Sequence, residues 1–261
     1  MHEFENIAFL DQQKTGSTTI ARALRKLLAE KEIYFDTHGA IPAEFDKAKK
    51  CFISVREPLS IYISLFKFGA GSKKGSLYNS LRKKELSHYY EPTLGAFETW
   101  LEFVLDPANA RTLNYDYADY GPVDCAGILT FRFLDLCLPK SRTRLKKVTT
   151  REKLERVLGR KHVYSEYVRT ESLYEDLFGV LRHWESDIKL EAPLTTPEDM
   201  IAKVKTQNVS RKIKGLTPDS VSPRLRNLVQ EREWLIYRTF GYDQSPNGLP
   251  TSCIANSAAS R

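Results

Sequence analysis

Short apolar runs alternate along the chain with longer segments whose apolar residues recur at helical spacing. The runs predict buried strands at residues 6–11, 33–35, 51–55 and 163–168. The helical spacing predicts helices at residues 17–31, 58–68, 94–105, 127–138, 151–158 and 224–237, and another that ends at Trp184. Strands that alternate with helices predict an α/β fold, here a P-loop-like three-layer fold with a central parallel sheet flanked by helices. We expect one domain over residues 1–243, and a tail over residues 244–261 without stable structure.

The loop between the first strand and the first helix is the clearest candidate for a binding site. It reads Gln12-Gln13-Lys14-Thr15-Gly16-Ser17-Thr18-Thr19. The first N–H groups of a helix have no partner within the helix, so a strand–loop–helix arrangement suits an anion. Gly16 permits close approach of the backbone, the hydroxyls add donors and Lys14 adds charge. The lysine precedes the glycine, so this is not the usual nucleoside triphosphate loop. An ordinary turn capped by Ser17 is the alternative.

A second anion-binding group follows the strand at residues 51–55. Arg56 ends that strand, and Ser64 lies eight positions later on the next helix. A guanidinium beside a hydroxyl and a helix N-terminus suits a phosphate, although an ion pair with Glu57 is the plainer interpretation of Arg56 alone. In a parallel sheet the carboxyl ends of the strands share one edge. We therefore expect the Lys14 loop, the His38 loop and Arg56 to meet there.

Composition narrows the classes of function. The 261 residues carry a formal net charge of +7, which fits an enzyme with an anionic ligand or a weak nucleic-acid binder. The basic residues are spread along the chain, which favours the first, and we expect no nucleic-acid partner. The four cysteines show no C-x-x-C spacing, so we expect free thiols and no metal site. No segment is apolar for long enough to span a bilayer, and we expect a cytoplasmic protein, or a Golgi lumenal one whose membrane anchor is absent from this sequence.

These two anion motifs resemble those of the sulfotransferases that use 3′-phosphoadenosine 5′-phosphosulfate (PAPS). The segment Lys14-Thr15-Gly16-Ser17-Thr18 is similar to their 5′-phosphosulfate loop, and Arg56-Glu57-Pro58 with Ser64 looks like their 3′-phosphate motif. The chain most resembles the carbohydrate enzymes, such as heparan sulfate 2-O-sulfotransferase. In those enzymes an active-site histidine stands where His38 lies. Two positions depart from the pattern, since Gln13 replaces a proline and Ala40 replaces a second histidine.

The resemblance implies transfer of a sulfuryl group from PAPS to an acceptor hydroxyl, expected on a glycan. Lys14 would stabilise the leaving phosphate and His38 would accept the proton, because an imidazole can do so at neutral pH, with Glu57 as the fallback base. The residues implied to bind the nucleotide are Lys14, Thr15, Gly16, Ser17, Thr18, Thr19, Arg56, Ser64, Ser210 and Arg211. His2 is interpreted as part of a frayed terminus. Two alternatives stay open: a P-loop-type small-molecule kinase and a non-catalytic polyanion-binding protein. The sequence does not indicate an oligomeric state.

Overall fold

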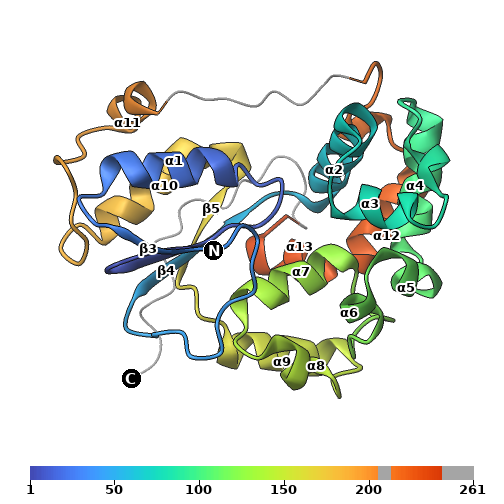
Figure 1. Ribbon diagram of the computed structural model, residues 1–261, viewed down its shortest axis with the longest axis horizontal. Coiled ribbons are helices and arrows are strands. Elements are labelled where there is room, and N and C mark those ends of the chain that lie inside the picture. Colours follow the sequence, from blue (N-terminus) through green and yellow to red (C-terminus); the bar gives the residue numbers. More distant parts are fainter. Residues whose placement is uncertain (205–212, 243–261) are drawn as a thin grey trace.

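The computed structural model describes residues 1–204 and 213–242 and has the α/β architecture that the sequence predicts (Figure 1). Within these residues one sheet contains five strands: β1 (His2–Phe4), β2 (Ile7–Leu10), β3 (Glu32–Phe35), β4 (Lys50–Val55) and β5 (Glu166–Arg169). The longer helices are α1 (Ser17–Leu27), α2 (Pro58–Ser72), α4 (Leu94–Leu105), α7 (Ile128–Cys137), α9 (Arg151–Lys161), α10 (Leu173–His183) and α12 (Pro223–Arg232). The shorter helices are α3 (Ser76–Arg82), α5 (Ala110–Leu113), α6 (Tyr115–Ala118), α8 (Ser141–Leu145), α11 (Pro197–Lys203) and α13 (Trp234–Phe240).

The sheet is mixed rather than parallel throughout, which corrects the sequence-based expectation. Its order is β3-β1-β2-β4-β5. Strands β2, β4 and β5 are parallel neighbours, with Leu10 opposite Ile53 and Val55 opposite Arg169. Strand β1 pairs antiparallel with both β2 and β3, so β3 runs in the same direction as β2. The carboxyl ends of β2, β3, β4 and β5 therefore meet at one edge, as the sequence predicts.

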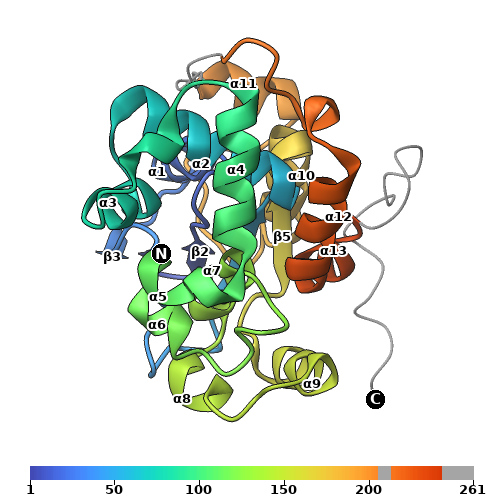
Figure 2. The same ribbon diagram turned by 90° about the vertical axis from the view of Figure 1, so that its right-hand side faces the viewer.

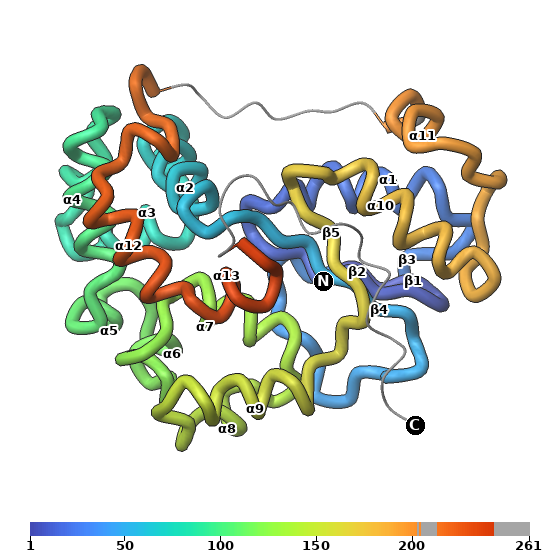
Figure 3. The backbone as a smooth tube through the Cα atoms, turned by 180° about the vertical axis from the view of Figure 1, so that it is seen from behind, coloured from blue at the N-terminus to red at the C-terminus, as the bar shows by residue number. Residues whose placement is uncertain are grey.

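Each of the central strands sends alternate side chains into two separate cores. On one face, Phe9 of β2 and Phe52 of β4 pack with Ile20 and Leu24 of α1 and with Leu177 of α10. The opposite face packs against helices α2, α7 and α13 through residues that include Leu10, Ile53, Val55, Tyr62, Phe133 and Phe240. This period of two is the expected pattern for a strand buried on both sides. Figures 1 and 3 show α1 and α10 on one side of the sheet and α7 and α9 on the other.

A helical lobe lies beyond the carboxyl edge of the sheet. Helix α12 packs against α2 and α4, and α2 also packs against α3 and α4 (Figure 2). Its centre is aromatic, with the Phe66 ring 5.4 Å from that of Trp100 and 5.6 Å from that of Tyr90. The sequence predicted that the helix beginning at residue 58 ends at residue 68. Instead α2 continues to Ser72, and Gly69 allows Tyr90 to pack closely, since a Cβ there would lie 2.4 Å from that ring.

No helix in residues 1–204 and 213–242 combines the length and the apolar character that crossing a bilayer requires. Cys51, Cys125 and Cys137 are free thiols, as expected, and Cys253 lies outside the described residues. Residues 244–261, the predicted tail, also lie outside them.

Candidate anion site at the sheet edge

The Lys14 loop joins the end of β2 to the start of α1. Gly16 is the N-cap residue, with φ 77°, and its carbonyl oxygen accepts hydrogen bonds from the N–H groups of Thr19 (2.9 Å) and Ile20 (3.2 Å). Among the described residues no side chain caps this helix and no acidic residue lies in its first turn. The remaining first-turn N–H groups are thus available to an anion.

The four hydroxyl side chains of the loop divide into two kinds. Thr15 is buried, and its hydroxyl lies 2.7 Å from the Gln12 carbonyl oxygen and 2.6 Å from Ser54 Oγ. It therefore anchors the loop to β4 and can serve a ligand only through its backbone. Thr19 is buried as well, whereas Ser17 is half-buried and Thr18 is exposed. Ser17 and Thr18 are the hydroxyls that a ligand can reach.

Lys14 and Arg56 lie together, although 42 positions separate them in sequence. An Arg56 Nη1 donates to the Lys14 carbonyl oxygen at 3.3 Å. The Lys14 ammonium sits 4.4 Å from the centre of the Phe68 ring. Burial and the adjacent Arg56 charge lower the pKa of Lys14. Ser64 follows on α2, two turns after Arg56, and is 7% exposed. The edge therefore brings together the lysine and the arginine that the sequence singled out.

Two further cations belong to this edge and were missed in the sequence. Lys67 Nζ donates to the Leu216 carbonyl oxygen at 3.0 Å, and its pKa is lowered by burial and by Arg56. Arg132 donates from Nη1 to Gln13 Oε1 and from Nη2 to Ser76 Oγ, each at 2.9 Å. Lys67 could have been found, because it continues the i, i+4, i+7 face that begins at Ser60 and Ser64. Arg132 could have been found as the one basic residue in the apolar helix α7.

None of these four cations, Lys14, Arg56, Lys67 and Arg132, forms an ion pair with a carboxylate in the part of the chain that the structure describes. Lys14 and Lys67 are each repelled by the Arg56 charge, and cations held together in this way favour the binding of an anion.

A buried carboxylate fixes the helix that carries Arg132. Glu233 is fully buried at the junction of α12 and α13. It accepts from the N–H groups of Leu129 (3.2 Å) and Thr130 (2.7 Å), from the Thr130 hydroxyl (2.7 Å) and from the Tyr62 hydroxyl. Glu233 thus caps the N-terminus of α7, where a negative charge is favourable. The single helix predicted over residues 224–237 is wrong for this reason: the chain bends at Glu233 to bring its carboxylate to α7.

The α2 N-terminus is already occupied and is not an anion site. Glu57 accepts from the N–H groups of Leu59 (2.9 Å) and Ser60 (2.6 Å), and from the Tyr237 hydroxyl. The Glu57 N–H in turn donates to Glu171 Oε1 at 3.1 Å. Any phosphate beside Arg56 would therefore be held by side chains. Glu57, expected as an alternative base, has a structural role as the cap of α2.

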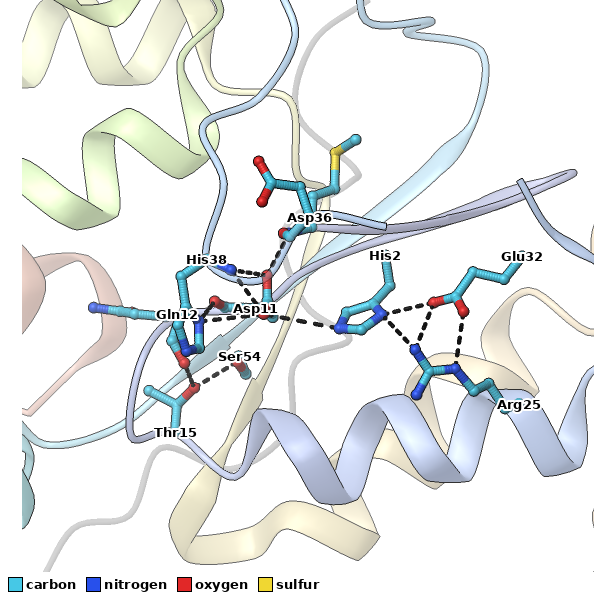
Figure 4. Close-up of polar contacts among 10 residues, drawn as sticks. His2, Asp11, Gln12, Thr15, Arg25, Glu32, Asp36, His38 and Ser54 are labelled. Atoms are coloured by element: carbon cyan, nitrogen blue, oxygen red, sulfur yellow. Dashed lines mark hydrogen bonds and ion pairs between the residues drawn. The ribbon is translucent and has the colours of Figure 1, made fainter. Parts of the chain in front are cut away.

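His38 lies at the same edge, in the loop that follows β3. Its N–H donates to both carboxylate oxygens of Asp11, at 3.1 and 3.0 Å. Its ring Nδ1 is 2.7 Å from the Asp11 carbonyl oxygen and 3.2 Å from Oδ2 (Figure 4). The His38 backbone is left-handed, with φ 56°, a conformation that costs on the order of 1–3 kcal/mol outside glycine. Asp11 therefore determines where this imidazole sits.

His2 is not a frayed terminus, as the sequence had suggested. It is 4% exposed, lies in β1, and its ring is 5.7 Å from Phe9 and 4.8 Å from Phe35. Its Nδ1 is 2.7 Å from Glu32 Oε1, and its Nε2 is 3.8 Å from Asp11 Oδ2 (Figure 4). A strand of three residues is too short to show a period, so the sequence gives no sign of this burial.

Ser210 and Arg211, predicted to close over a nucleotide, lie outside the described residues. Within the described ranges, no three His, Cys, Asp or Glu side chains are grouped as metal ligands.

Comparison of the chain with protein-family models, with curated proteins and with solved structures gives no match. Its function must be inferred from the site itself.

Proposed function

We propose that this protein is a PAPS-dependent sulfotransferase of the carbohydrate type, with a P-loop-like arrangement of strand, loop and helix at its centre. One observation carries the proposal: Lys14, Arg56 and Lys67 gather, without a carboxylate partner among the described residues, beside the uncapped N-terminus of α1. A bisphosphate nucleotide has two anionic ends, and the two motifs offer two separate groups of donors to hold them.

The 5′ end of the donor would be held at the start of α1. The N–H groups of the first turn and the Ser17 and Thr18 hydroxyls donate to the phosphate, and Gly16 allows the backbone to approach it. The 3′-phosphate would be bound by the Arg56 guanidinium and the Ser64 hydroxyl. A charge-assisted pair of this kind distinguishes a 3′,5′-bisphosphate from ATP.

The reaction would be an in-line transfer. The acceptor oxygen forms a bond to sulfur while the bond from sulfur to the bridging phosphate oxygen breaks, and its electron pair leaves with 3′,5′-ADP. Lys14 stabilises the charge that develops on the departing oxygen, and His38 takes the acceptor proton. Positioning and electrostatic stabilisation do most of the work, as in phosphoryl transfer.

Calorimetry with 3′,5′-ADP tests the nucleotide site. We expect Arg56→Ala to weaken binding by about 10–100-fold, since hydrogen bonds to charged groups contribute about 1.5–3 kcal/mol. The matched control is Arg224→Ala, because Arg224 forms an exposed pair with Glu102 on the helical lobe. Equal affinity for 5′-AMP and 3′,5′-ADP would contradict the proposal.

Transfer of radiolabelled sulfate from PAPS to a panel of glycans tests the reaction. We expect Lys14→Ala and His38→Ala to lower the rate, the second by about 10²–10⁴-fold, the usual contribution of a general base. Magnesium-dependent ATP turnover without sulfate transfer would instead favour a kinase. Salt-sensitive polyanion binding that 3′,5′-ADP does not affect would favour a non-catalytic binder.

A further inference from the structure

Asp11 contacts His38 at both its backbone N–H and its imidazole ring. The carboxylate accepts the His38 N–H through both of its oxygens, and the ring Nδ1 faces both the Asp11 carbonyl and Oδ2. The Asp11 side chain is 2% exposed, whereas that of His38 is 32% exposed. Asp11 is thus the buried residue of the pair, and His38 reaches solvent at the edge where a ligand would bind.

The contacts determine which ring nitrogen carries the proton. Both groups that face Nδ1, a carbonyl oxygen and a carboxylate oxygen, can only accept hydrogen bonds. A neutral imidazole placed there must therefore carry its hydrogen on Nδ1, which leaves the lone pair on Nε2.

We propose that Asp11 is a positioning residue that fixes the Nδ1–H tautomer of His38 and so presents Nε2 as the base for the acceptor hydroxyl. This inference rests on the proposed sulfuryl transfer. When the acceptor oxygen attacks sulfur, its proton passes to Nε2 and the imidazole becomes an imidazolium. The Asp11 carboxylate, 3.2 Å from Nδ1, stabilises that positive charge, and the proton then leaves to solvent from the exposed side of the ring.

The surroundings of Asp11 strengthen this coupling. Among the described residues, the charged and titratable groups that face its carboxylate are the Met1 amino group, His2 of β1, and His38 in the loop after β3. His2 is itself held by Glu32, which Arg25 of α1 pairs at 2.9 Å (Figure 4). Asp11 is buried beside these groups. In this environment of low dielectric constant, hydrogen bonds to Asp11 are stronger than they would be in water.

The tautomer can be measured without any variant. In protein labelled with ¹⁵N at histidine, the chemical shifts of the His38 ring nitrogens distinguish Nδ1–H from Nε2–H, and His38→Gln assigns the signals. We expect Nδ1–H in the wild-type protein. An Nε2–H tautomer would overturn the proposal, whether or not Asp11→Asn folds.

Asp11→Asn then tests the role in catalysis. An asparagine keeps the size of the side chain but removes its negative charge, whereas the Asp11 backbone carbonyl, 2.7 Å from Nδ1, still accepts its hydrogen. We therefore expect the Nδ1–H tautomer to persist while the stabilisation of the imidazolium is lost. We expect kcat for sulfate transfer to fall by about 10-fold or more, within the range that a general base contributes, with KM for PAPS unchanged. The acid limb of the kcat/KM profile should move to lower pH. An unchanged kcat and an unchanged pH profile would contradict the proposal.

A double variant separates positioning from general damage. If Asp11 acts through His38, Asp11→Asn in a His38→Ala background should lower kcat no further, because residues that act as a unit are not additive. A further 10-fold loss would overturn the inference. The experiments distinguish failure of this inference from failure of the proposed function. If His38→Ala protein stays fully active, His38 is not the base, although the protein still transfers sulfate. If the wild-type protein transfers no sulfate from PAPS, the proposed function is refuted, and the tautomer measurement stays valid.

Discussion

Lys14 carries its charge at a place where the folded protein disfavours it. Its backbone is left-handed, with φ 68°. Burial and the neighbouring Arg56 charge lower the pKa of its ammonium group. Both features reduce the stability of the free protein. A bound anion would offset the unfavourable burial and repulsion of the ammonium charge. Perturbed groups of this kind are concentrated at functional sites.

Replacing Lys14 should therefore stabilise the free protein while removing its ligand. We expect Lys14→Met to raise the free energy of unfolding by about 0.5–2 kcal/mol, roughly 2–4 °C in Tm per kcal/mol. Binding of 3′,5′-ADP should be lost in the same variant. Thermal unfolding with and without the nucleotide measures both effects. Lys153→Met is the control, because Lys153 is exposed, and it should change neither the stability nor the nucleotide binding. A Lys14→Met protein that is less stable than the wild type and still binds 3′,5′-ADP would refute this interpretation of Lys14.

Gly16 is the other residue of the loop on which the geometry depends. A Cβ there would lie 2.6 Å from Leu173 Cδ1, and the φ of 77° is costly for any other residue. We expect Gly16→Ala to cost about 1–3 kcal/mol in unfolding free energy and to weaken nucleotide binding. Gly179→Ala on α10 is the matched control, because a Cβ there meets nothing within 4 Å, and it should stabilise by about 0.5–1 kcal/mol. Urea unfolding compares them, and equal effects would contradict the prediction.

At the scale of elements, helix α7 connects the helical lobe to the anion site. Glu233 holds its N-terminus, and Arg132, one turn further, reaches Gln13 of the loop and Ser76 of α3. Gly127 permits this arrangement, because a Cβ there would lie 2.0 Å from Glu233 Oε1. The position of one cation at the site is thus set by a carboxylate that has no access to ligand.

Removing that carboxylate should weaken both the fold and the site. Glu233→Ala leaves the Leu129 and Thr130 N–H groups and the Tyr62 hydroxyl without their partner in the core, and we expect a loss of about 3–5 kcal/mol. Glu102→Ala breaks an exposed pair with Arg224 and should cost about 0–1 kcal/mol. Urea unfolding measures the difference, and a Glu233 variant as stable as the Glu102 variant would refute the capping role.

At the scale of the whole molecule, stability should fall in acid in two separate steps. Burial lowers the pKa of His2 more than Glu32 and Asp11 raise it. The unfolded chain then binds the His2 proton more readily, so stability decreases as pH falls through the window below about 6.5. Burial raises the pKa of Asp11, but the hydrogen bond from His38 and the charge of the Met1 amino group outweigh burial. The pKa of Asp11 is therefore lowered on balance. Its contribution is present above about pH 3.9 and is lost only as pH falls through its lowered value.

The two steps can be assigned by substitution. We expect His2→Phe, which keeps an aromatic ring between Phe9 and Phe35, to reduce the first loss of stability. The reduction is about 1.4 kcal/mol for each pH unit by which folding lowers the pKa of His2. Asp11→Asn should remove the second step and enlarge the first, because the Asp11 charge raises the pKa of His2 in the folded protein. Urea unfolding between pH 8 and pH 3 measures both. An unchanged slope between pH 7 and pH 5 in His2→Phe would refute the assignment.

Local pattern predicted much of the fold correctly. Helix α4 matches its predicted range of residues 94–105, and β2 and β4 match their predicted ranges to within one residue at each end. Each of these elements is marked in the sequence by an apolar run or by apolar residues at one regular spacing. Strand β1 and the bend at Glu233 were missed because each depends on partners far away in sequence: β1 on β2 and β3, and the bend on Leu129 and Thr130.

For the site, the sequence by itself determined the chemistry of the loop: a lysine, a glycine and hydroxyls between a strand and a helix, with an arginine at the end of another strand. Local spacing is enough for that, because the groups are neighbours in the chain or follow the ends of strands. Only the tertiary structure decided which hydroxyls are free, that Lys67 and Arg132 join the cations, and that Asp11 orients His38. Those facts depend on burial and on contacts across the sheet, which a linear pattern does not contain.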